Sequence, residues 1–261
     1  MKTAAFALGL LAALRIAQGA DIALGKTSFK SGDLEVPASI AKPHGKGPFP
    51  PVLYIHARRG FEEADQRHIS SLAEQGFLVL APDWQSARFI ERWPTAHDPA
   101  TESDIEAGLD ALKALPGACA IPAGVVGYSR GGYYAIRLAA KRGKDLAAIA
   151  TYAGHMQNPN APEPEQLFGI APEVMTVTTP MLMLIGELDF ELRRTNGGRA
   201  FYALYERGVP VELQYYPLAR RAFDFRADQS PEEKIATKHA RERVAAWLRK
   251  HMPLDAQGAC R

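Results

Sequence analysis

Residues 124–132 read GVVGYSRGG, and this stretch decides the fold class. It begins as an apolar run rich in valine, typical of a buried strand, and it runs into the helical pattern of residues 131–142. Ser129 lies between the two, with Gly127 and Gly131 two positions away on either side. A sharp strand-to-helix turn leaves no room for side chains at those two positions. The pattern therefore predicts a crowded turn that projects the Ser129 hydroxyl beyond the edge of a sheet.

Strand-like and helix-like segments alternate on both sides of this turn. We expect further strands at residues 51–56, 77–83, 146–153, 180–186 and 211–216, and helices at residues 64–75, 101–115, 198–207 and 232–250. Residues 20–44 are expected to add edge strands, and residues 156–179, rich in Pro and Asn, to form a loop or small lid. Repeated strand–helix–strand units predict one α/β domain with a mainly parallel central sheet and helices on both faces.

Composition excludes several classes of function. The chain has 261 residues, 47% of them hydrophobic, and a formal net charge of +2 without a long Lys/Arg run. This charge is too small to indicate a nucleic acid or a membrane surface as partner. No pair of histidines has the spacing of metal ligands, so we expect no metal and no cofactor. A small molecule is the expected partner, and the oligomeric state stays open.

The two ends of the chain carry separate signals. Residues 1–20 begin with Lys2, continue with an uncharged apolar stretch and end in small residues, which is typical of a secretory signal peptide and predicts a secreted or periplasmic protein. The domain is then expected at residues 21–253 and a mobile tail at residues 254–261. Cys119 and Cys260 either form a disulfide in an oxidising compartment or are unrelated thiols, and the sequence leaves both open.

An acidic residue follows the turn in the chain order that nucleophilic catalysis by such a serine requires. Residues 181–189 read MLMLIGELD, an apolar strand followed by a glycine turn and a carboxylate. Asp189 is the candidate for the acid that orients a catalytic base, and Glu187 is a weaker one. The alternative is that Asp189 caps the following helix.

From about residue 35 to residue 250 the chain resembles the dienelactone hydrolase family of α/β-hydrolases. The resemblance rests on residues 51–60, 72–77, 81–83, 127–131, 185–189 and 215–217. It implies an α/β-hydrolase fold in which Ser129 is the nucleophile, at a position where much of the family has a cysteine. The oxyanion would be bound by the backbone amide of Arg130, at the start of the helix, and by that of Arg58, with Ala57 as the alternative.

The resemblance fails at the histidine. The family reads roughly Tyr-Pro-Gly-Ala-x-His-Gly-Phe after its last strand, whereas residues 216–223 read YPLARRAF, with Arg221 at the histidine position. Arginine stays protonated and cannot act as a general base. Either His155 supplies the base, with His56 and His239 as weaker candidates, or hydrolysis is lost and the pocket only binds. In a third reading, the substrate or water carries the proton while Arg221 stabilises negative charge.

Several arginines are expected near the site. They lie on loops at the carboxyl ends of predicted strands, where ligands bind in open α/β sheets, at positions 58, 59, 88, 130, 220 and 221. Converging guanidinium groups suit a carboxylate, phosphate or sulfate, although each could instead pair with a nearby acidic residue. The candidates for substrate binding are Arg88, Arg221, Arg59 and Trp84, and the resemblance implies a carboxylate-binding role for Arg88.

These observations favour an exported serine hydrolase that acts on a small, anionic ester or lactone. In this interpretation Ser129 attacks the carbonyl, Asp189 orients the base, and His155 is the base. The alternative is a catalytically silent protein of the same fold that binds an acidic small molecule.

Overall fold

The apolar runs predicted as strands form one eight-stranded sheet in the computed structural model, which describes residues 22–162 and 165–261. Its strands, in order across the sheet, are β1 (Ile22–Ser31), β2 (Leu34–Pro43), β4 (Leu78–Pro82), β3 (Pro51–Ile55), β5 (Ala123–Tyr128), β6 (Leu146–Tyr152), β7 (Met181–Leu188) and β8 (Val211–Arg220). The pairs β1–β2 and β2–β4 are antiparallel, and all other pairs are parallel. The predicted single α/β domain with a mainly parallel sheet is confirmed, and β1 and β2 are the strands expected at its edge, within the described residues.

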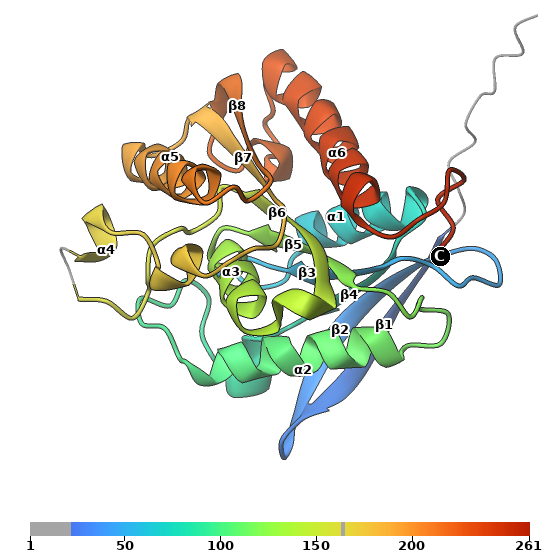
Figure 1. Ribbon diagram of the computed structural model, residues 1–261. Helices are drawn as coiled ribbons and strands as arrows, with labels where there is room; N and C mark the ends of the chain where they lie inside the picture. The colour runs from blue at the N-terminus through green and yellow to red at the C-terminus, as the bar shows by residue number, and fades with distance from the viewer. Residues whose placement is uncertain (1–21, 163–164) are drawn as a thin grey trace, which may run out of the picture.

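Helices cover both faces of the sheet, as Figure 1 shows. α1 (Glu63–Glu74) and α6 (Pro231–His251) pack on one face, and α2 (Ala100–Ala114), α3 (Arg130–Arg142) and α5 (Glu191–Glu206) pack on the other. The connections contain the short turns η1 (Ser86–Arg88), η2 (Gly143–Asp145), α4 (Glu165–Phe168), η3 (Pro172–Met175) and η4 (Phe223–Phe225). The connection expected as a loop at residues 156–179 thus holds α4 and η3.

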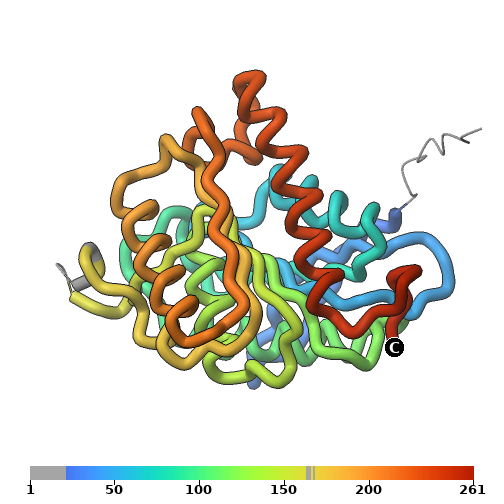
Figure 2. Tube along the Cα trace, turned by 45° about the horizontal axis from the view of Figure 1, so that its top comes forward, coloured from blue at the N-terminus to red at the C-terminus, as the bar shows by residue number. Residues whose placement is uncertain are grey.

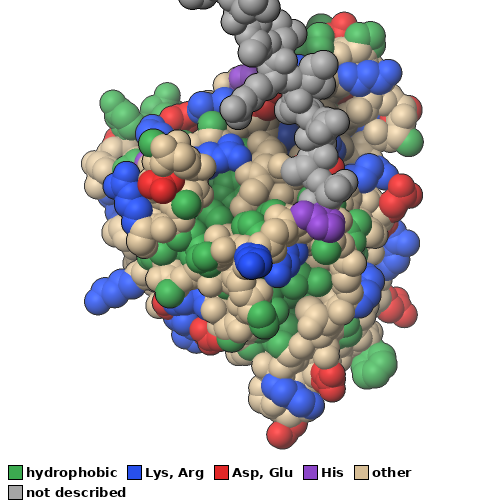
Figure 3. Space-filling view, turned by 90° about the vertical axis from the view of Figure 1, so that its right-hand side faces the viewer, with side chains coloured by type: hydrophobic (Ala, Val, Ile, Leu, Met, Phe, Trp, Pro, Cys, Tyr) green, Lys and Arg blue, Asp and Glu red, His purple; other side chains and the backbone are tan. Residues whose placement is uncertain are grey.

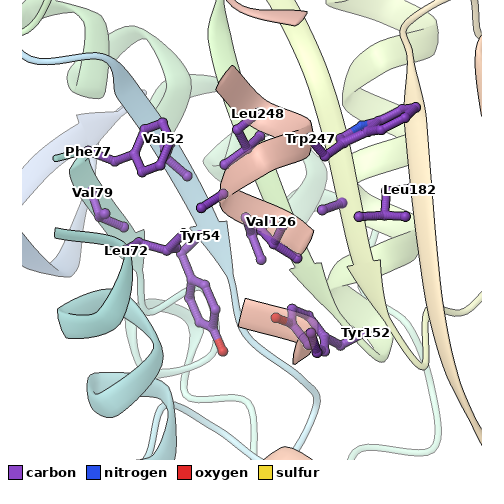
Figure 4. Packing of buried hydrophobic residues seen from close by; sticks show 14 of the residues in the cluster. Val52, Tyr54, Leu72, Phe77, Val79, Val126, Tyr152, Leu182, Trp247 and Leu248 are labelled. Atoms are coloured by element: carbon purple, nitrogen blue, oxygen red, sulfur yellow. The ribbon is translucent and has the colours of Figure 1, made fainter. Parts of the chain in front are cut away.

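The alternation of side chains along β3 divides the core into two clusters. Val52 and Tyr54 point to the face covered by α1 and α6, and Leu53 and Ile55 point to the opposite face. Figure 4 shows Val52 and Tyr54 beneath α6, whose Leu248 lies over the strands. All of these side chains are fully buried, and each such burial is worth about 1.5–3 kcal/mol. The two buried faces explain why the central strands read as continuous apolar runs.

The C-terminal tail folds back beside the loop that precedes β5 (Figure 2). Cys260 forms a disulfide with Cys119, with 6.2 Å between their Cα atoms, and Leu254 pairs with Cys260 in an antiparallel bridge. The structure thus favours the first of the two readings of the cysteines. These contacts tie the tail down, and its mobility in solution stays a prediction.

Charge on the surface is mixed. Figure 3 shows basic and acidic side chains interspersed with apolar ones on one face of the molecule. Exposed pairs such as Lys30 and Glu35, with 3.6 Å between the charged atoms, neutralise each other locally. Within the described residues, no helix combines the length and apolar character needed to cross a bilayer. The predicted signal peptide at residues 1–20 lies outside the described residues.

Helix α5 differs from the prediction at its start. It begins at Glu191 rather than at residue 198, so it continues through Asn196, Gly197 and Gly198. Gly197 faces the sheet, where a Cβ atom would lie 2.5 Å from Cδ1 of Ile185. The predicted start was wrong because these residues usually interrupt helices, whereas Gly197 here allows the helix to approach β7 closely.

Because α5 begins at Glu191, alanine should affect the free energy of unfolding differently at the adjacent positions Gly197 and Gly198. Gly198 has open space around its Cα atom, so Gly198→Ala should raise the free energy of unfolding by about 1 kcal/mol through helix propensity. Gly197→Ala should show no such gain, because its new methyl group would meet Ile185. Urea unfolding of both variants beside the parent measures this. Equal loss of stability in both would mean that the helix does not extend through these residues.

Candidate active site

Ser129 occupies a strained turn between β5 and α3. Its backbone angles are φ 51° and ψ −111°, a conformation that L-residues rarely adopt. A Cβ atom on Gly131 would lie 2.0 Å from the carbonyl oxygen of Ile55, and one on Gly132 would lie 2.6 Å from Cα of Gly154. The loops that follow β3 and β6 therefore pack directly against the turn, which explains the glycines in the sequence.

Hydrogen bonds fix the turn against the neighbouring strand. The Ser129 amide donates to the carbonyl oxygen of Tyr152 (2.9 Å), and the His155 amide donates to the carbonyl oxygen of Ser129 (2.8 Å). The backbone of Arg130 opens α3, where a helix terminus favours negative charge, and Arg58 follows β3 on the adjacent loop. The expected oxyanion-binding amides therefore lie at the carboxyl ends of β5 and β3, and their role stays a prediction.

Arg221 lies between Ser129 and Asp189. Its Nη2 atom donates a hydrogen bond to Ser129 Oγ at 2.9 Å, and its Nη1 atom lies 3.9 Å from Asp189 Oδ1. Asp189 is buried, and its Oδ1 atom also accepts a hydrogen bond from the Phe190 amide (2.7 Å). Burial raises the pKa of Asp189, and the positive charge of Arg221 opposes this rise. The predicted serine, acid and arginine thus form one linear arrangement, although they are up to 92 residues apart in sequence.

The chemistry of the guanidinium group limits the role that Arg221 can have beside Ser129. A guanidinium group donates hydrogen bonds but cannot accept the hydroxyl proton. The hydrogen bond from Arg221 occupies one lone pair of Ser129 Oγ. The positive charge of Arg221 would stabilise an anion that forms at or near this oxygen. Arg221 therefore suits the binding of negative charge, and proton transfer requires another group.

His155 is buried beside the same turn. Its Nε2 atom has no hydrogen-bond partner within the described part of the chain. Burial lowers the pKa of His155 well below its usual value, and the charges of Arg193, Arg130 and Arg221 lower it further. The imidazole is therefore neutral at neutral pH, and its burial and the surrounding cations disfavour its protonated form. Its role as the general base stays a prediction.

Arg193, which the sequence reasoning missed, belongs to the same cluster. It lies in the first turn of α5, one helical turn after Asp189, and its Nη1 atom donates to Gln157 Oε1 at 2.6 Å. Burial, and then the charge of Arg221, lower the pKa of Arg193 to about 9. The sequence reasoning missed Arg193 because it started the helix at residue 198, whereas α5 begins at Glu191 and brings Arg193 into its first turn, close to Asp189 in the chain.

Two other predicted arginines, Arg88 and Arg220, have carboxylate partners. Arg88 forms a bidentate pair with the buried Asp104, at 2.5 and 2.9 Å. Arg220 pairs with Glu233 (2.7 Å) and with Asp228. These pairs tie loops to α2 and α6, and a direct contact of Arg88 with substrate stays a prediction.

Arg59 lies in the loop after β3, and Trp84 contacts the start of this loop. Arg59 donates to the buried Asp65 at 2.7 Å, and its guanidinium lies 4.0 Å from the ring centroid of Phe225. Trp84 is buried, and its Nε1 atom donates to the carbonyl oxygen of His56 (3.3 Å). Both side chains support the loop that carries Arg58, and a contact of Trp84 with substrate stays a prediction.

A cleft of about 220 Å³ opens in front of Ser129. Its lining includes Arg59, Trp93, Tyr128, Ser129, Arg221 and Phe225. Trp93 is 58% exposed, so the rim offers an aromatic surface next to cationic groups. The size admits only a small ligand in contact with Ser129.

The low pKa of His155 predicts a pH dependence of stability. The unfolded chain takes up a proton near pH 6.5, whereas the folded state does not, so His155 destabilises the folded state as pH falls below 6.5. The loss should reach about 1.4 kcal/mol for each further pH unit until the folded pKa is reached. Urea unfolding between about pH 7.5 and 5 should show a smaller loss for His155→Gln than for the parent. Equal losses would mean that His155 titrates normally.

Comparisons with known proteins agree with the fold. The model of the "Dienelactone hydrolase family" matches residues 36–252. A Methylorubrum extorquens protein named "Putative carboxymethylenebutenolidase" is 24% identical over 87% of this chain and 81% of its own length. The "Dipeptidyl-peptidase 5" of Porphyromonas gingivalis is 28% identical over 56% of this chain, but over only 26% of its own length.

A solved structure is similar over almost the whole domain. The crystal structure of a "Putative Dienelactone Hydrolase" from Klebsiella pneumoniae superposes with a TM-score of 0.73 at 23% sequence identity, covering 87% of this chain and 98% of that one. At this identity the likeness concerns the fold. Because the family model spans residues 36–252, and thus all strands from β3 to β8, the chain belongs to the dienelactone hydrolase family of the α/β-hydrolases.

Proposed function

We propose that this chain is a serine hydrolase for small carboxylic esters or lactones that carry a negative charge. The observation that carries the proposal is the position of Arg221, whose guanidinium lies 2.9 Å from Ser129 Oγ and beside Asp189. A ligand placed for attack by Ser129 lies within reach of this charge. Membership of the family, and the names of its relatives, favour ester or lactone hydrolysis as the reaction.

The proposed reaction uses groups from several loops. Ser129 Oγ attacks the carbonyl carbon, and its proton passes to the neutral imidazole of His155. The backbone amides of Arg130 and Arg58 bind the oxyanion. Arg221 leaves Ser129 Oγ to bind the negative group of the substrate, and Asp189 holds the guanidinium in place. The protonated His155 then returns its proton to the leaving oxygen, and water hydrolyses the acyl-enzyme.

Export is part of this proposal. The signal-like residues 1–20 would direct the chain to the periplasm or beyond. The disulfide between Cys119 and Cys260 supports an oxidising compartment, because such bonds rarely persist in the cytosol.

One observation favours a second function. Arg221 occupies the place where the resemblance implies a histidine, and it donates to the hydroxyl that a base should activate. A protein built this way could bind an acidic small molecule and leave it unchanged.

Two esters separate these functions. The mature chain from residue 21 should hydrolyse mono-p-nitrophenyl succinate with a kcat/KM about tenfold or more above that for p-nitrophenyl butyrate, because one charge-assisted contact supplies this difference. Ser129→Ala should abolish both activities. Arg221→Gln should remove the preference for the charged ester, because Gln keeps a donor and loses the charge.

Three outcomes test separate parts of the proposal. Equal kcat/KM for the two esters would contradict the anionic substrate. Unchanged turnover in His155→Gln would contradict His155 as the base. If the parent turns over neither ester, but Arg221→His does, the chain is the binding protein and the hydrolase proposal fails.

A further inference from the structure

Four arginines from the segments around Ser129 form an arginine cluster, defined here as Arg58, Arg130, Arg193 and Arg221. They come from four different segments: the loop after β3, the start of α3, the first turn of α5 and the end of β8. Arg221 donates to Ser129 Oγ, Arg130 follows Ser129 in the chain, and Arg193 donates to Gln157, two residues after His155. Burial lowers the pKa of His155, and the positive charges of all four arginines lower it further. We propose that this cluster binds a dianion, either one phosphoryl group or two carboxylates.

The partners of the arginine cluster are almost all neutral. Arg193 donates to Gln157 Oε1, Arg58 to the carbonyl oxygen of Pro94 (3.3 Å), and Arg130 to His97 Nδ1 (3.3 Å). Within the described residues, only Arg221 of the four lies within 4 Å of a carboxylate, Asp189. One acidic group therefore faces four cations.

Two of these side chains also have buried donors without partners. Arg130 is 95% buried, and neither its Nε atom nor that of Arg193 has a hydrogen-bond partner in the described part of the chain. Buried donors are nearly always satisfied, and a buried charge is costly unless it is paired. Arg88 and Arg220, at the same edge of the sheet, do have carboxylate partners, Asp104 and Glu233. A bound anion would satisfy the cluster.

The number of charges indicates a dianion. A ligand with one negative charge would still leave the cluster with a large positive excess around His155. Four guanidinium groups from separate loops can surround a tetrahedral phosphate or grip two carboxylates, with paired N–H donors for each oxygen pair. Such a ligand would also raise the pKa of His155 by offsetting the cations that now lower it.

This inference deepens the proposed function, because it names the charge of the substrate that the same site would accept. It depends on the proposed function only for the idea that the ligand is a substrate. Binding can be measured without turnover, so loss of binding and loss of hydrolysis are separate results.

The test is calorimetric titration of the mature chain with inorganic phosphate, succinate and acetate at constant ionic strength, at about pH 8, where phosphate is mainly doubly charged. Phosphate or succinate should bind saturably and at least about tenfold more tightly than acetate. Tighter binding of phosphate would identify a phosphoryl ligand, and tighter binding of succinate a dicarboxylate. Failure of both to bind better than acetate would overturn the proposal.

Two variants on α5 test the role of Arg193, one at Arg193 itself and one, as the control, at Arg199. Arg193→Gln should weaken dianion binding about tenfold or more, whereas Arg199→Gln, an exposed arginine of α5, should bind as the parent does. In chloride buffer without dianion, Arg193→Gln should melt at the same temperature as the parent or higher, because it removes a buried charge without a counterion. Equal binding by both variants, or a much lower Tm of Arg193→Gln, would assign Arg193 a structural role instead.

Discussion

Backbone crowding at Ser129 is the constraint on which the rest of the site depends. A Cβ atom on Gly127 would lie 2.4 Å from the carbonyl oxygen of Gly131, so strand and helix meet without any intervening side chain. The same closeness brings the end of β3 to Gly131 and the loop after β6 to Gly132. The loops after β3 and β6 are therefore held against the turn that carries the hydroxyl, and this packing sustains the strained backbone of Ser129.

Electrostatics at this edge of the sheet follow from that packing. Burial keeps His155 neutral and disfavours the charge of Asp189, and the neighbouring guanidinium groups lower the pKa of His155 further. A hydrolase of this fold usually relies on a histidine between serine and acid. Here Arg221 holds that place, so a positive charge lies beside the hydroxyl, and hydrolysis would require a base from elsewhere. In the proposed function, Arg221 would have to release the Ser129 hydroxyl before it binds the negative group of a substrate.

Much of this could be predicted from the sequence, because it depends on local patterns. The alternation of apolar strands and helices predicted the sheet, and the glycines around Ser129 predicted the turn. Chain order predicted an acid at Asp189, and the resemblance to the family implied that Arg221 lies at the histidine position beside Ser129. Arg193 escaped prediction because Gly197 and Gly198 suggested a helix break, whereas close packing on Ile185 requires a glycine at position 197. The partner of Arg88 escaped as well, because Asp104 lies on a helix whose placement only the tertiary structure reveals.

The central claim is that Ser129 remains a nucleophile although Arg221 occupies the histidine position. Reaction of the mature chain with a fluorophosphonate, followed by intact-mass spectrometry and peptide mapping, tests it most directly. We predict a single adduct on Ser129, absent from Ser129→Ala and formed more slowly in His155→Gln. A parent chain that stays unlabelled, beside an Arg221→His variant that reacts, would contradict the claim and show that the scaffold is intact but silent.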